Sequence, residues 1–147
     1  MVKSNFSDFF HALNKLFAFL LHYSVFFCIF AAVNYANMFY IQKTLTISAA
    51  HNLNLSYESK CEQLHGHNWV ITVYCKAKEL NKDGMVTDFT HIKRVVKDTF
   101  DHKYLNDVLD VNPSAENIAR WICEHVENCY KVSAQESEGN VAIYEKD

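Results

Sequence analysis

Three histidines have a spacing that would let their imidazoles meet. His65 and His67 are two residues apart, and His51 ends an earlier segment of alternating apolar residues. Residues two apart on a strand point to the same side, so His65 and His67 can face one ion while His51 arrives from a neighbouring strand. Three imidazoles without a fourth protein ligand are typical of a catalytic zinc site, whose remaining position stays open for water or substrate. On local pattern alone, three ordinary polar histidines are an equal alternative.

Cys61 lies four residues before His65, in the run CEQLHGH. It could be a fourth ligand that closes a structural zinc site, a buried core cysteine, or a thiolate that acts as base or nucleophile beside the metal. The residues before it, YESK, are polar, so the core position is the least favoured of the three. The other cysteines of this part of the chain fit faces of the expected helices and strands, and we interpret them as packing residues: Cys75, Cys123 and Cys129.

Two further places carry acid–base side chains. Asp101 and His102 are adjacent, and such a pair can form a proton relay if the turn folds the two groups together. Glu136 stands near the expected end of a strand, where its carboxylate could accept two hydrogen bonds from a guanidine-like edge. Each has a simpler alternative, because His102 can interact with the dipole of a helix C-terminus and Glu136 can be a solvated turn residue. Taken alone, the pattern favours these simpler alternatives.

The elements that would position these side chains are predicted from periodicity. Apolar residues alternate from Leu45 to His51, which predicts a strand that ends at the histidine. Residues 69–77, WVITVYCKA, form a second strand that the HGH segment opens. Residues 132–136 and 140–144 have the composition of two shorter strands, joined by a turn at SEG.

Two segments have the spacing of amphipathic helices. Asp88 caps the first, whose apolar stripe runs to Phe100. Residues 112–114, NPS, begin the second, and the helical spacing of its apolar residues continues to Cys129. The order strand, strand, helix, helix, strand, strand predicts an α+β fold with an antiparallel four-stranded sheet and two helices on one face. Such a small sheet leaves open edges, which oligomerisation would cover.

Composition limits the classes of protein that the chain can belong to. A chain of 147 residues with 50% hydrophobic residues can form one domain with a core. The net charge of −3 gives no support for a nucleic-acid partner. Five cysteines without framework spacing indicate a reducing compartment rather than a disulfide scaffold, so we expect a cytoplasmic protein.

The first 37 residues differ from the rest of the chain. Residues 16–33 form an apolar run of 18 residues, slightly short of the ~20 that a transmembrane helix needs. Lysines precede the run, as in a signal peptide, but no clean cleavage site follows. The segment could be an anchor, a signal, or sequence translated upstream of a start at Met38; we favour the last and place the anchor second. We therefore divide the chain into a hydrophobic N-terminal extension, 1–37, and a domain, 38–147, and expect membrane association only if the extension is an anchor.

Six blocks resemble the 6-pyruvoyltetrahydropterin synthase superfamily in order and spacing. They are SAAH (48–51), CEQLHGHN (61–68), VTDF (86–89), DHKYLN (101–106), NPSAE (112–116) and ES (136–137). The resemblance covers Met38 to about Tyr144, and the first two blocks contain all the candidate metal ligands. Three residues separate the cysteine from the first histidine of the pair, which is similar to the 6-carboxytetrahydropterin synthase branch of the queuosine pathway.

The resemblance implies the tunnelling fold, in which the sheets of a homo-oligomer close into a barrel with active sites at subunit interfaces. It also implies a zinc-dependent lyase of a pterin triphosphate. The substrate would be 7,8-dihydroneopterin triphosphate, and the products would be 6-carboxy-5,6,7,8-tetrahydropterin, acetaldehyde and triphosphate.

A role for each candidate residue follows from the same resemblance. These roles are Zn²⁺ ligand for His51, His65 and His67, general base for Cys61, opposing proton relay for Asp101 and His102, and pterin anchor for Glu136. Two alternatives stay open. One is a 6-pyruvoyltetrahydropterin synthase, which uses the same site with a different outcome after triphosphate is lost. The other is a non-catalytic zinc-stabilised module in which Cys61 is the fourth ligand.

Overall fold

The computed structural model describes residues 13–20 and 37–146. Its internal contacts divide the chain into two units, Met1–Asn37 and Met38–Asp147. In the first unit, residues 13–20 form a helix. Among the described residues, no helix has the length and apolar character needed to span a membrane. Most of the apolar run 16–33 lies outside the described residues, so its assignment as anchor, signal or upstream sequence stays a prediction.

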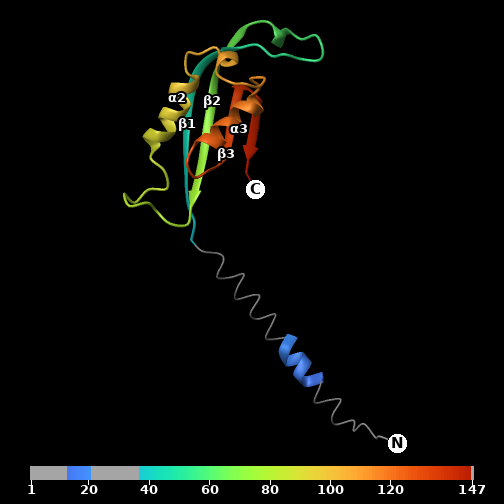
Figure 1. Cartoon of the computed structure of the whole chain (residues 1–147), viewed down its shortest axis with the longest axis vertical. Helices are drawn as coiled ribbons and strands as arrows, with labels where there is room; N and C mark the ends of the chain where they lie inside the picture. The colour runs from blue at the N-terminus through green and yellow to red at the C-terminus, as the bar shows by residue number, and fades with distance from the viewer. Residues whose placement is uncertain (1–12, 21–36, 147) are drawn as a thin grey trace, which may run out of the picture. The chain divides into compact units, whose positions relative to one another are not determined.

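The second unit contains one antiparallel sheet whose strands follow the order of the sequence (Figure 1). The strands are β1 (Phe39–His51), β2 (His65–Ala77), β3 (Cys129–Ser137) and β4 (Asn140–Glu145). The four-stranded sheet predicted from periodicity is therefore confirmed, and every strand is longer than its alternation indicated. β1 and β2 pair along their whole length, with His51 directly opposite His65. This register brings the segments that carry the three histidines to the same end of the sheet.

Two helices lie between β2 and β3 in the sequence. α2 (Phe89–Phe100) begins after Asp88, whose carboxylate accepts a hydrogen bond of 2.7 Å from the N–H of Thr90. The predicted capping role of Asp88 is therefore confirmed. α3 (Ala115–His125) begins after Ser114, whose hydroxyl accepts a hydrogen bond from the N–H of Asn117. In both cases a short polar side chain satisfies an N–H group that the first turn leaves without a partner.

The second helix ends earlier than predicted. α3 stops at His125, the chain reverses at Asn128 with a positive φ of 57°, and Cys129 begins β3. Cys129 is nevertheless buried, because a register shift between β2 and β3 leaves Tyr130 without an opposite residue and turns both Cys129 and Val132 toward the core. Assigning Cys129 to the helix was therefore wrong: buried residues on either side of a chain reversal imitate helical spacing.

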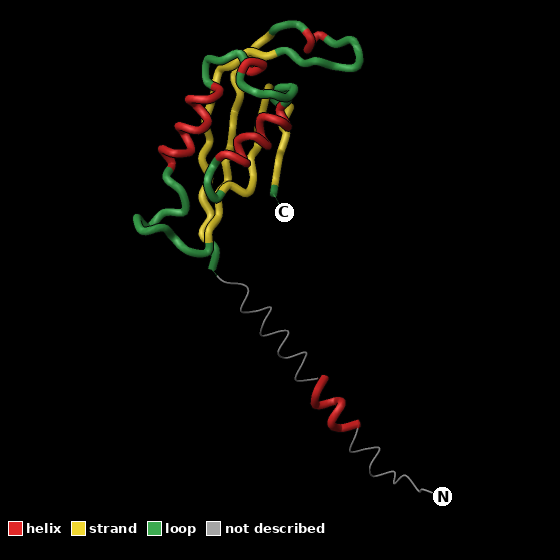
Figure 2. The backbone as a smooth tube through the Cα atoms, viewed as in Figure 1, coloured by secondary structure: helices red, strands yellow, loops and turns green. Residues whose placement is uncertain are grey.

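The hydrophobic core lies between the two helices and one face of the sheet (Figure 2). Buried and more exposed residues alternate along β1 and β2, and the helices bury residues into the same cluster. Two short 3₁₀ helices were not predicted: η1 (Lys60–Glu62) in the β1–β2 loop, and η2 (Leu105–Asp107) between α2 and α3. Figure 2 shows that the β1–β2 loop extends past the end of the sheet that carries the histidines. Closure of several such sheets into a barrel stays a prediction.

Candidate metal centre

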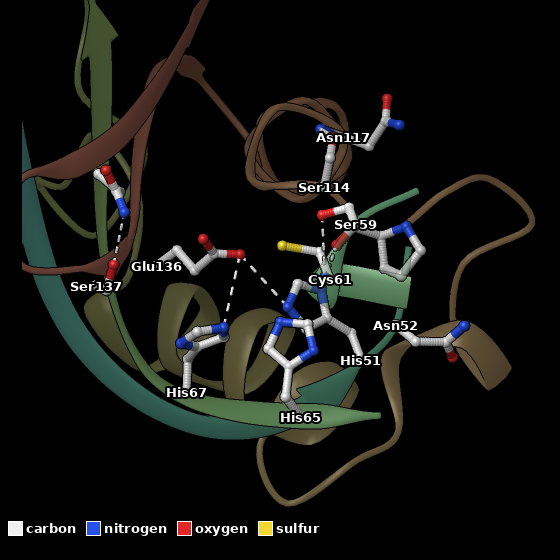
Figure 3. Close-up of polar contacts among 12 residues, drawn as sticks. His51, Asn52, Ser59, Cys61, His65, His67, Ser114, Asn117, Glu136 and Ser137 are labelled. Atoms are coloured by element: carbon white, nitrogen blue, oxygen red, sulfur yellow. Dashed lines mark hydrogen bonds and ion pairs between the residues drawn. The ribbon is translucent and has the colours of Figure 1, made fainter. Parts of the chain in front are cut away.

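The paired ends of β1 and β2 bring the three predicted histidines together (Figure 3). The ring centres are 4.5 Å apart for His51 and His65, 5.3 Å for His51 and His67, and 4.9 Å for His65 and His67. His51 is fully buried, whereas His65 and His67 are half-buried. The group is therefore anchored in the core on one side and accessible on the other.

Two backbone carbonyls fix the orientation of two of the imidazoles. His51 Nδ1 lies 2.8 Å from the carbonyl oxygen of Pro113, and His65 Nδ1 lies 2.7 Å from that of Gln63. A carbonyl only accepts hydrogen bonds, so in each ring Nδ1 carries the proton and the lone pair is on Nε2. Histidines that bind metals commonly donate their other nitrogen in this way.

The inward-facing nitrogens are the unusual feature of this group. Among the described residues, His51 Nε2 and His67 Nε2 are buried and have no hydrogen-bond partner. Burial also lowers the pKa of His51 from its usual value, so that this ring stays neutral and able to coordinate. Buried polar atoms without hydrogen-bond partners are uncommon in folded proteins, and here the two belong to neighbouring rings of one group. A cation between them would satisfy both.

Glu136 of β3 is directed at the same point. Its Oε1 atom lies 3.4 Å from His51 Nε2 and 3.8 Å from His67 Nε2. One donor atom from each of the three histidines and from Glu136 lies within 4.8 Å of the others. Imidazole nitrogens with a carboxylate oxygen suit a borderline divalent cation such as zinc. The glutamate predicted to bind a pterin is thus placed where it could also contact the metal.

Trp69 forms the wall behind the group and was not singled out from the sequence. It is fully buried, and its ring is edge-to-face with His51 at 5.2 Å and with His67 at 5.5 Å. It follows His67 by two residues on β2 and so faces the same side of the sheet. The alternation of β2 contained this signal, since Trp69 begins its buried face.

Cys61 lies on η1, in the loop above the histidines. A capping box holds this turn: the N–H of Cys61 donates to Ser59 Oγ at 3.2 Å, and Glu62 accepts from the N–H of Ser59 at 3.1 Å. Figure 3 shows the thiol pointing toward the side where Glu136 and His51 lie. Cys61 is half-buried, which disfavours a purely core role. Although described, it is not one of the four residues whose donor atoms converge, which also speaks against a closed four-ligand site.

Asp101 and His102 lie at the end of α2. The carboxylate of Asp101 accepts hydrogen bonds from Lys97 Nζ at 2.7 Å and from the N–H of Ser48 at 2.9 Å. These two contacts, that of Lys97 first, hold the pKa of Asp101 below its usual value. Asp101 is thereby kept as an anion.

The His102 imidazole is not part of the histidine group. Its backbone has a positive φ of 56°, its side chain is 83% exposed, and its Nε2 lies 4.0 Å from Asp101 Oδ1. His102 and His67 nevertheless line one open cavity of about 490 Å³. Within one chain, the two groups of the predicted relay, Asp101 and His102, are therefore only in loose contact, and His102 lies at the open side of this cavity.

A family model described as 6-pyruvoyl tetrahydropterin synthase matches residues 40–147. The chain belongs to this family. The match contains every candidate site residue and most of the chain, and the resemblance seen in the sequence is thereby confirmed.

Proteins that are similar to this chain carry several names. A Synechocystis sp. protein named 6-carboxy-5,6,7,8-tetrahydropterin synthase is 39% identical in an alignment of 99 residues that covers 61% of this chain and 76% of the relative. A Pyrococcus furiosus protein named dihydroneopterin monophosphate aldolase is 37% identical over 84 residues, 55% of this chain and 68% of the relative. The Caenorhabditis elegans 6-pyruvoyl tetrahydropterin synthase structure has a TM-score of 0.61 at 26% identity, covering 76% of this chain and 97% of that one.

A second cavity adjoins the histidine group. It measures about 380 Å³, and Glu136, Glu116 and the first residues of α3 line it. Glu116 was quoted as part of a matching block, but no role was predicted for it. The sequence signal was its place in the first turn of the helix, two residues after the Ser114 cap, where a carboxylate also lies beside the positive end of the helix dipole.

Proposed function

We propose that this protein is a zinc-dependent lyase that converts 7,8-dihydroneopterin triphosphate and one water into 6-carboxy-5,6,7,8-tetrahydropterin, acetaldehyde and triphosphate. The observation that carries the proposal is the pair of buried imidazole nitrogens, on His51 and His67, that lack hydrogen-bond partners beside a third imidazole. Family membership supports a pterin substrate, and the name of the Synechocystis relative supports the carboxy product.

His51, His65 and His67 would hold Zn²⁺, with the Nδ1–H groups of the first two held by backbone carbonyls. The ion would supply Lewis acidity toward the side-chain oxygens of the substrate. Cys61, on the adjacent turn, would take the proton from the acidified carbon as general base. Asp101 would stay ionised and orient His102, which would exchange the second proton from the opposite side.

Glu136 would anchor the pterin ring. Its carboxylate lines the cavity of about 380 Å³ together with Glu116, and the volume falls in the range of small-molecule sites. The amino-pyrimidine edge of a pterin is rich in N–H donors, which carboxylates accept through charge-assisted hydrogen bonds. The contact of Glu136 with the histidines supports a second arrangement, in which its carboxylate would be a further ligand of the Zn²⁺.

The exposed position of His102 supports a homo-oligomer in which a neighbouring chain completes the site. β1 and β4 are the two edge strands of the sheet. Pairing of such edges would give partners to the exposed backbone N–H and C=O groups of β4 and would extend the sheet face that carries the exposed Val141 and Ile143.

Incubating the purified full chain with zinc and 7,8-dihydroneopterin triphosphate tests the proposal. We expect acetaldehyde, triphosphate and a pterin with the mass of the 6-carboxy product. Triphosphate without acetaldehyde, with the three-carbon side chain retained, would establish the 6-pyruvoyl alternative. If the triphosphate is not consumed while zinc stays bound, the non-catalytic zinc module is favoured.

A further inference from the structure

We infer that Asn106 and Asn112 are positioning residues for Cys61: their side-chain amides clamp the segment after β1 that holds the Cys61 backbone. The inference rests on the proposed function only for what the Cys61 thiol does. The contacts themselves are independent of the reaction.

Each asparagine exchanges two hydrogen bonds with the backbone of one residue. Asn106 Oδ1 accepts from the N–H of Asn52 at 3.0 Å, and its Nδ2 donates to the carbonyl of Asn52 at 2.9 Å. Asn112 forms the same two bonds with Asn54: its Oδ1 accepts from the N–H of Asn54 at 2.9 Å, and its Nδ2 donates to the carbonyl of Asn54 at 3.0 Å. A residue pair in an antiparallel ladder exchanges the same two bonds, so the amides act as substitutes for a neighbouring strand. They continue the fixed part of the chain past the end of β1 at His51.

Leu53 lies between the two clamped residues and connects them to Cys61. Its N–H donates to the carbonyl oxygen of Cys61 at 2.8 Å. Among the described hydrogen bonds, the N–H of Cys61 binds only Ser59, within the same loop. The bond to Leu53 therefore ties η1 to the clamped segment after β1. Any displacement of Leu53 would move Cys61 with it.

Both clamps stand on parts of the fold that are themselves held. Asn106 lies in η2, and Asn112 is fixed by Asn117 Nδ2, which donates to its carbonyl oxygen at 2.8 Å. The residue after Asn112 is Pro113, whose carbonyl orients His51. One short segment therefore orients a candidate metal ligand and positions the loop of the candidate base. This arrangement would keep the distance between the Cys61 thiol and the candidate metal site constant.

The test compares variants of the full chain. Asn106→Ala removes both bonds to Asn52, whereas Asn106→Asp keeps the acceptor and removes only the donor. Asn81→Ala is a matched control, because Asn81 Oδ1 also accepts from two loop N–H groups, those of Asp83 and Met85, beyond the other end of β2. The measurements are hydrogen exchange of the Leu53 amide, the rate at which iodoacetamide alkylates Cys61 (identified by peptide mass), zinc content, and kcat and KM separately.

In Asn106→Ala we expect Leu53 exchange and Cys61 alkylation to become about fivefold faster or more, with zinc content unchanged, and in Asn106→Asp a smaller change in the same direction. Asn81→Ala should leave both rates at the wild-type value. If the enzyme turns over, kcat should fall more than KM rises. Wild-type exchange and alkylation rates in the folded Asn106→Asp variant would overturn the inference, whatever the activity assay shows. Should Asn106→Ala fail to fold, Asn106→Asp alone decides.

Discussion

The nitrogen that each imidazole turns inward decides whether the histidine group can bind a metal. The carbonyls of Pro113 and Gln63 take the Nδ1 protons of His51 and His65, so the lone pairs face the centre of the group. Glu136 adds the only charge that contacts His51 or His67 in an ion pair among the described residues. A neutral imidazole group with one carboxylate binds a divalent cation more readily than a protonated one would.

Replacing His65 or His67 by alanine should therefore remove the metal. We expect about one zinc per chain in the purified protein and a loss of bound zinc together with activity in either variant, measured by elemental analysis. His125→Ala is the matched control, since its Nδ1 also donates to a backbone carbonyl, that of Trp121, outside the group. Full zinc content in both His65→Ala and His67→Ala would rule out this site.

Cys61→Ala should separate a base from a ligand. Because the three histidines and Glu136 converge without Cys61, we expect zinc content to be unchanged and the free energy of unfolding to stay within about 1 kcal/mol of wild type. Turnover should be abolished, since the carboxylate of the neighbouring Glu62 is engaged in the capping box. Cys61→Ser, which keeps the size without the thiol, should be equally inactive. Joint loss of zinc and stability would instead support the structural module.

Glu136→Gln distinguishes the two positions open to this carboxylate. As a pterin anchor it would contribute charge-assisted hydrogen bonds of about 1.5–3 kcal/mol each, so we expect KM for the pterin to rise about tenfold or more. Zinc content should not change. Glu138→Gln, in the exposed turn that follows, is the control. Loss of zinc with unchanged KM would make Glu136 a metal ligand rather than an anchor.

At the scale of elements, the last turn of α2 keeps the carboxylate of the following residue, Asp101, ionised. Lys97 and the Ser48 N–H depress the pKa of Asp101 in the folded protein, so the contribution of Asp101 to stability is present above its unfolded pKa and is lost as pH falls through the lower folded value. Lys97→Met should therefore raise the pKa of Asp101, as NMR titration would show. The substitution should lower the free energy of unfolding by less than about 1 kcal/mol, and this difference from wild type should be largest at neutral pH and shrink below about pH 4.

Lys97→Met and wild type should be compared as zinc-free proteins, so that loss of metal in acid does not contribute to the difference in stability. Lys93→Met is a control on the same helix, because Lys93 is exposed and forms no ion pair among the described residues. An Asp101 pKa that is identical in Lys97→Met and wild type would show that another contact controls the carboxylate.

The strands and helix starts could be predicted from the sequence because each is encoded locally. Alternation placed His51 at a strand end, and the short polar caps Asp88 and Ser114 marked the helix starts. The contacts that complete the site could not be predicted in this way. The His51–Pro113 contact joins residues 62 apart, and the Asn106 clamp joins residues 54 apart, through backbone atoms that every residue possesses. Nothing in the local pattern of Asn52 or Pro113 indicates such a partner.

At the scale of the molecule, the edges of the sheet determine how chains could associate. The segment after α2 covers the end of β1: the N–H of His102 donates to the Ser48 carbonyl at 2.7 Å, and the N–H of Ala50 donates to the Lys103 carbonyl at 3.0 Å. The remainder of that edge and the outer edge of β4 have no strand partner among the described residues. We expect edge pairing between copies to bring an exposed His102 toward a neighbouring chain.

A chain that begins at Met38 tests both this assembly and the proposed division of the sequence. The contacts of the protein separate at Asn37 and Met38, and every candidate site residue lies downstream of that point. We therefore expect the shortened chain to be an oligomer by light scattering, to hold about one zinc per chain, and to turn over the pterin triphosphate at the rate of the full chain. Its β1 edge begins immediately after the cut, so oligomer formation also tests whether that edge is free to pair. Aggregation of the shortened chain, with a full chain that is stable only in detergent, would favour the anchor hypothesis for residues 1–37. A soluble shortened chain that remains a monomer and is inactive would show instead that the extension takes part in assembly.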